Sequence, residues 1–176
     1  MYWLRVIAVL LVAALLQTTI VPALAVRGTR PDLLLLVAAC LAVREHPQRG
    51  WRWRAFWIGW AAGLVADIYS AGAQIPFGVT ALVFGLLGMA VSKLGEELFV
   101  GSCIAQVLIM APICIAGHCA LAAAHVAFGG RLFSGALGQA FWTGMYSGLM
   151  APLVFAAMRP LQRYLGVRPQ RRFGHA

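Results

Sequence analysis

The feature that most constrains this chain is a series of long apolar runs separated by short polar segments. Of its 176 residues, 62% are hydrophobic and 11% are charged, whereas a soluble domain is about half apolar and about a quarter charged. A membrane-spanning helix needs about 20 mostly apolar residues. Candidate spans of this kind lie at about 5–26, 31–46, 55–72, 75–92, 98–128 and 135–158. Little chain remains for a soluble catalytic domain, which disfavours nucleases, kinases and dinucleotide-binding enzymes.

These runs predict an all-α integral membrane protein. We expect a six-transmembrane-helix bundle over residues 1–158 and a basic cytoplasmic tail over 159–176. Helices are the natural form because backbone groups in hydrocarbon must be paired within their own segment, and the runs lack the alternation of barrel strands. The apolar part of the second run, Pro31 to Val43, reaches only about 20 Å. It must therefore recruit flanking residues, thin the bilayer or lie shielded by its neighbours.

The distribution of basic residues predicts the orientation. With six spans and a cytoplasmic N-terminus, only Arg27, Arg30 and Arg131 face outward, and every other Lys or Arg faces the cytoplasm. This asymmetry agrees with the positive-inside rule, so both termini are expected in the cytoplasm. The net charge of +9 therefore indicates anionic lipid rather than nucleic acid as a partner. We predict that the tail contacts lipid or a cytoplasmic protein through Arg163, Arg168, Arg171 and Arg172.

The third run contains the most informative motif. Gly59 and Gly63 lie four residues apart, which places them on one helical face and lets another helix approach closely. Asp67 lies one turn further along, where a carboxylate in lipid must be paired or hydrated. We expect Asp67 to fasten the outer ends of the second to fourth helices, by pairing with Arg30 or by capping a helix start. Proton relay and substrate binding remain alternatives, although a lone carboxylate is a poor catalyst.

The sixth run carries a second small-residue face. Gly144 and Gly148 lie one turn apart, and Pro152 removes the hydrogen-bond donor to the Gly148 carbonyl, which predicts a kink. The face can pack within the bundle or on another protein. We hypothesise that the third and sixth helices, together with the tail, contact partner proteins.

The fifth run holds three residues that can bind metals. Cys114, His118 and His125 project from one side of the predicted helix. A soft metal is conceivable there, but His125 lies about 10 Å along the axis from His118. Hydrogen bonds to neighbouring helices are the favoured interpretation. We find no nucleophile–histidine–acid arrangement, paired carboxylate or phosphate-binding glycine loop elsewhere, so neither enzyme activity nor a cofactor is expected.

Taken in order, these motifs resemble the MreD family of rod shape-determining membrane proteins. The resemblance rests on Arg30-Pro31-Asp32 before the second run, on Gly59, Gly63, Asp67 and Ser70 in the third, and on Gly148, Pro152, Phe155, Met158 and Arg159 in the sixth. It implies a non-catalytic scaffold subunit of the bacterial cell-elongation machinery, which builds sidewall peptidoglycan, in the inner membrane. The partners that it implies are an MreC-like protein, the MreB filament system, and the assembly of RodA with a class B penicillin-binding protein.

The alternative function is the substrate-binding subunit of an energy-coupling-factor vitamin transporter, since such subunits resemble MreD-like proteins in size and six-helix form. They typically carry an Ala-xxx-Ala face on the first helix and an outward-facing polar cavity. The alanines of the first run do not form that face, and few polar residues are available for such a cavity.

Overall fold

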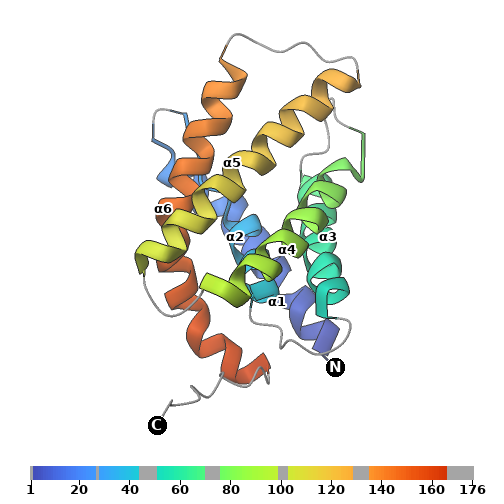
Figure 1. Cartoon of the computed structure of the whole chain (residues 1–176), viewed down its shortest axis with the longest axis vertical. Helices are drawn as coiled ribbons and strands as arrows, with labels where there is room; N and C mark the ends of the chain where they lie inside the picture. Colours follow the sequence, from blue (N-terminus) through green and yellow to red (C-terminus); the bar gives the residue numbers. More distant parts are fainter. Residues whose placement is uncertain are drawn as a thin grey trace.

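The fold is an all-helical bundle. The computed structural model describes residues 2–26, 28–43, 51–69, 76–98, 103–128 and 135–165. In chain order its elements are α1 (Tyr2–Thr19), the 3₁₀ helix η1 (Val21–Leu24), α2 (Leu33–Val43), α3 (Trp51–Tyr69), α4 (Val79–Leu98), α5 (Cys103–Ala127) and α6 (Ala136–Leu165). No β-strand occurs among these residues. Successive helices run in alternating directions, so that the start of α1 and the end of α6 lie at the same end of the molecule (Figure 1).

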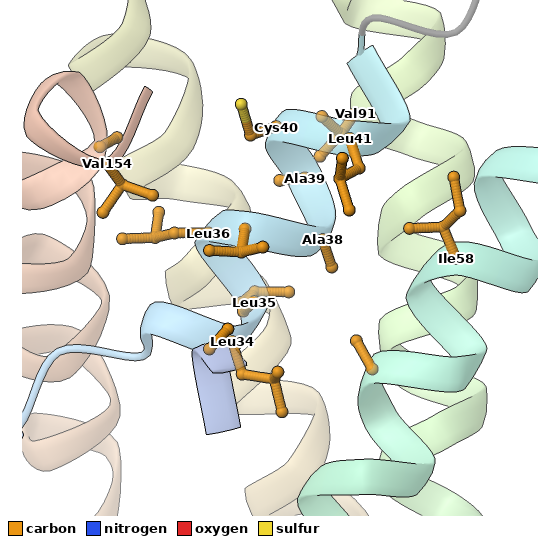
Figure 2. Close-up of a cluster of buried hydrophobic side chains, with 14 of the residues drawn as sticks. Leu34, Leu35, Leu36, Ala38, Ala39, Cys40, Leu41, Ile58, Val91 and Val154 are labelled. Atoms are coloured by element: carbon orange, nitrogen blue, oxygen red, sulfur yellow. The ribbon is translucent and has the colours of Figure 1, made fainter. Parts of the chain in front are cut away.

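The short helix α2 forms the centre of the core. Every residue from Leu34 to Ala42 is buried, and α2 packs against α1, α3, α4 and α6. A helix that is apolar on all sides is stable only when it is surrounded. Figure 2 shows Leu36 of α2 facing Val154 of α6, with Leu41 beside Val91 of α4. Neighbouring helices therefore shield the short second run, which is one of the options expected for it.

Helices α3 to α6 form two helical hairpins beside α2, namely α3–α4 and α5–α6. A Cβ added at Gly88 of α4 would lie 2.6 Å from the Ala55 carbonyl oxygen of α3. In the other hairpin, a Cβ added at Gly148 of α6 would lie 2.6 Å from the Ala111 Cα of α5. Both separations are closer than real Cβ contacts, so each hairpin holds its helices together at glycines where backbones nearly touch.

Some helix boundaries differ from the predicted spans. Helix α1 ends at Thr19, and η1 takes its place over the rest of the first run. The cause is Pro22, which lacks the N–H that would continue the α-helical bonding and restricts the residue before it. Helix α6 continues past Met158 to Leu165, so the first part of the predicted tail is helical.

Three of the described helices are long and apolar enough to cross a membrane. They are Tyr2–Thr19, Cys103–Ala127 and the Ala136–Met158 part of α6. Two further apolar segments, Leu33–Val43 and Val79–Leu94, are shorter. At 1.5 Å per residue α2 is about 17 Å long, roughly half the thickness of the hydrocarbon layer.

Candidate functional site: a polar junction at the start of the central helix

The main polar site within the described bundle lies at the start of α2, and its side chains come from Gln17, Asp32, His118 and Ser147. We call these four residues the polar junction. The Gln17 amide of α1 contributes in two directions. Its Nε2 donates to the Pro31 carbonyl over 3.2 Å, and its Oε1 accepts from the Leu33 N–H over 2.7 Å. One side chain therefore satisfies a donor and an acceptor that the helix start would otherwise leave unpaired.

Asp32 caps the N-terminus of α2. Its Oδ1 accepts from the Leu35 N–H over 3.0 Å, three residues further on, and its carbonyl accepts the first helical bond, from Leu36. This is the usual geometry of an aspartate N-cap, and the carboxylate also lies at the positive end of the helix dipole. The Asp32 N–H donates over 2.9 Å to Oγ of Ser147, which is completely buried in α6. Asp32 therefore joins the start of α2 to α6.

His118 of α5 completes the junction without a hydrogen bond. Its Nε2 lies 3.9 Å from Oδ2 of Asp32, which is too long for a hydrogen bond. The atom is buried and has no hydrogen-bond partner within the described structure. The sequence predicted hydrogen bonding for this histidine, and at Nε2 that prediction is wrong. Three His, Cys, Asp or Glu side chains placed to hold a metal ion do not occur among the described residues.

Asp67 joins the two helices of the α3–α4 hairpin by a contact at the start of α4, whereas the described residues show no hydrogen bond between its side chain and the second helix, which was also expected. Its Oδ2 accepts from the Gly78 N–H over 2.7 Å, and Gly78 accepts the first bond of α4 through its carbonyl. Asp67 is 8% exposed. The alternative pairing with Arg30 is not present: within the described residues Arg30 is an exposed side chain, and no ion pair joins it to Asp67. The carboxylate instead links the end of α3 to the start of α4.

Both predicted glycine faces lie inside the bundle. A side chain at Gly59 would meet the backbone of Phe84, and one at Gly63 would meet that of Ala81, both on α4. Substitution of Gly144 would likewise displace Ile115 on α5. The glycines of the third and sixth helices are therefore occupied by this chain's own helices and are not free for a partner.

The remaining predicted residues fall in three groups. Pro31 is buried and its carbonyl belongs to the polar junction. Pro152 lies within α6, which continues past it. Arg163 is in the last turn of α6, whereas Arg168, Arg171 and Arg172 lie outside the described residues.

Sequence reasoning overlooked Gln17, Ser147 and Tyr146 as interacting residues. The Tyr146 hydroxyl donates over 2.9 Å to the Leu24 carbonyl and so attaches η1 to α6. The available signal was that each is a polar side chain within an apolar run, where such groups seek partners. That signal does not name the partner, because the partner depends on how neighbouring helices are rotated.

Chemically, this arrangement fastens helices together. Gln17, Ser147 and Asp67 satisfy backbone groups at helix starts, and the Asp32 side chain caps the start of its own helix. The fold and the site thus define a class: an all-helical membrane protein whose described polar groups serve mainly its own structure. The family model of the rod shape-determining protein MreD matches residues 1–161.

The chain therefore belongs to the MreD family, as the motifs of its sequence suggested. No curated protein and no solved structure is similar enough to count as a match. Membership implies a role in determining rod shape, as a structural protein of the membrane. The residues matched by the family model include every member of the polar junction and both glycine faces.

Proposed function

We propose that this protein is a non-catalytic scaffold subunit of the bacterial cell-elongation machinery. In this proposal it binds an MreC-like protein in the inner membrane and works with the MreB filament system and with RodA and its class B penicillin-binding protein. The observation that carries the proposal is the family match over residues 1–161. The use of polar side chains to fasten helices supports a structural role, because a catalytic site would keep such groups available for substrate.

The proposed topology has six crossings, with both termini in the cytoplasm. Support comes from the alternating helix directions, which bring the start of α1 and the end of α6 to one end of the molecule (Figure 1). Arg5 and Arg54 lie in the first turns of α1 and α3, and Lys93 lies within the last two turns of α4, all toward that end, as cytoplasmic basic residues should. Since neighbouring helices surround α2, its short length does not expose unpaired backbone to lipid.

Partners in this proposal contact the outward surfaces of the helices rather than the glycine faces. Helix α6 presents Leu149, which is 63% exposed, and Leu153, which is 67% exposed. By contrast, Ala151 of the same helix is completely buried. The basic tail adds a cytoplasmic surface for anionic lipid or for a partner beneath the membrane.

The first test is replacement and co-purification in a rod-shaped bacterium that lacks its own family member. We expect the chain to restore rod shape and to co-purify with the MreC-like protein of that bacterium. Rounded cells despite normal membrane levels of the chain would contradict the proposed function. A vitamin bound to the purified protein would instead support a transporter subunit.

Cysteine crosslinking then tests the contact surface. In a background where Cys103, the exposed native cysteine, is serine, Leu149→Cys should crosslink to a different polypeptide in the membrane. Ala151→Cys provides the matched control, because the two positions share a helix and differ in burial. Equal capture by both variants, or capture by neither, would contradict the assignment of this side of α6.

A further inference from the structure

The outward face of α3 carries a continuous row of aromatic rings. Trp53, Phe56, Trp57 and Trp60 contact one another in sequence, edge to face, with ring centroids 6.2, 5.5 and 5.4 Å apart. We call these four residues the aromatic stripe. Trp53 is 63% exposed and Trp57 is 46% exposed, while the Phe56 ring lies against Gly85 of α4. The rings hold one another in place, so the stripe needs little ordering when it binds a partner.

The position of Trp60 distinguishes this face from a surface that meets only lipid. Trp60 lies six residues after Arg54 and seven before Asp67, which is about 9 Å and about 10.5 Å along the helix. In the proposed topology it therefore lies near the middle of the hydrocarbon, which is about 30 Å thick. Tryptophan usually lies at the membrane boundary, where its indole N–H meets water or headgroups. The exposed Trp3 and Trp142 follow this habit, since each lies within two turns of a helix start.

The Trp60 indole is a donor without an acceptor in the described structure. An indole has one N–H and no acceptor atom, and no hydrogen bond from the Trp60 side chain occurs among the described residues. The neighbouring Trp57 ring is only a weak acceptor. An unpaired donor in hydrocarbon costs free energy, and headgroup oxygens begin about 15 Å from the bilayer centre. The acceptor must therefore come from a protein that covers the stripe.

We propose that the aromatic stripe is a docking surface for one transmembrane helix of another protein, which presents a hydroxyl or an exposed backbone carbonyl opposite Trp60. This inference rests on the proposed scaffold function and its six crossings, and it adds a second contact surface to that on α6. A helix with Ser, Thr or Gly at this depth fits, because small residues let backbones approach and leave oxygens within reach. A second copy of the chain does not fit, since like stripes paired about a two-fold axis place donor against donor.

Photocrosslinking in the membrane of a rod-shaped bacterium tests the surface. Benzoylphenylalanine in place of Trp60 exchanges one aromatic side chain for another, so the fold is retained. We expect it to attach to a membrane-spanning segment of a different protein, within one turn of a Ser, Thr or Gly, as located by mass spectrometry. Attachment to lipid alone, or to a second copy of this chain, would overturn the inference. Capture through Leu149→Cys without capture at Trp60 would overturn the stripe and leave the proposed function standing.

Two matched substitutions then isolate the hydrogen bond. Trp60→Phe and Trp53→Phe each remove one indole N–H and a similar area of ring, but Trp53 lies at the boundary, where water replaces the lost partner. With the captured protein co-expressed at full length, Trp60→Phe should weaken its binding in detergent about 3- to 20-fold, and Trp53→Phe by less than about twofold. Where the acceptor is Ser or Thr, its replacement by Ala should add nothing to the effect of Trp60→Phe. Equal effects of the two Phe variants would overturn the hydrogen bond and with it the proposed partner helix.

Discussion

The two hairpins of this protein are closed by the same kind of contact but to different extents. In α3–α4, glycines of both helices meet the opposing backbone: Gly59 and Gly63 on α3, and Gly88 on α4. In α5–α6 only glycines of α6 do so, at Gly144 and Gly148, and the two helices spread apart toward the start of α6 (Figure 1). The difference shows that both helices contribute glycines to the close approach in the first hairpin, whereas only α6 contributes them in the second.

The contacts that α2 makes with the two hairpins also differ in kind. Its contacts with α3 and α4 in the core are apolar, through residues such as Ile58 and Val91 (Figure 2). Its first turn is bound through side chains of α1 and α6, namely Gln17 and Ser147. Directional hydrogen bonds thus supply on the α5–α6 side a constraint that close backbone packing supplies within α3–α4.

The largest expected effect comes from adding a methyl group at these glycines. Gly63→Ala would place a Cβ against the backbone of Ala81, and with Gly59 and Gly88 also in contact the helices cannot separate locally. We expect destabilisation of about 2–3 kcal/mol. Gly148→Ala should cost about half as much, because only one helix of that hairpin contributes glycines to the close approach, which leaves the other helix freer to shift. Thermal unfolding in detergent measures both.

Gly138→Ala is the matched control for these substitutions. Gly138 lies in α6, and nothing is within 4 Å of an added Cβ. Alanine there should stabilise the helix by about 0.5–1 kcal/mol, since glycine loses more backbone entropy on folding. A cost at Gly148 equal to or above that at Gly63 would show that the two hairpins do not differ as described.

An intermediate effect is expected from the carboxylate that joins α3 to α4. Asp67→Ala leaves the Gly78 N–H without its acceptor, which should cost about 1.5–2 kcal/mol. Asp67→Asn keeps an acceptor oxygen in place and should retain most of the stability. Urea or thermal unfolding of the two variants separates these outcomes. Equal losses would mean that the charge of Asp67, rather than its hydrogen bond, fastens this end of the hairpin.

The smallest effect is expected where η1 meets α6. Tyr146→Phe removes the hydroxyl that donates to the Leu24 carbonyl, and because the contact is exposed the loss should be about 0.5–1 kcal/mol. Tm should fall by about 1–4 °C. A loss of stability as large as that of Gly148→Ala would contradict this expectation. It would mean that the bond between Tyr146 and η1 constrains the α5–α6 hairpin as strongly as its glycine contacts do.

Several features of the fold could be predicted from the sequence because their causes are local. Apolar runs and the cost of unpaired backbone predict helices, and glycines four residues apart predict a face for close packing. Asp67 as a helix-start partner was one of two roles expected from its position. The end of α1 before Pro22 could also have been predicted, since proline removes a backbone hydrogen-bond donor.

The polar junction could not be predicted in this way. Its bond between Asp32 and Ser147 joins residues 115 positions apart, and the sequence does not state the rotation of either helix. The sequence indicated Asp32 as part of a family motif and His118 as a candidate metal ligand. Nothing in their positions along the chain indicated that the two side chains lie close together. The same limit applies to the glycine faces, whose presence is local but whose partners are not.

The amino-acid sequence by itself determined that this chain folds as helices suited to a membrane and where those helices can approach closely, because hydropathy and side-chain size act within a few turns. Only the tertiary structure decided which helices meet, and hence that Asp32 faces a buried histidine nitrogen with no hydrogen bond. The physical reason is that hydrogen bonds are directional and short. A helix rotation of a few tens of degrees leaves the apolar pattern intact but changes every polar partner.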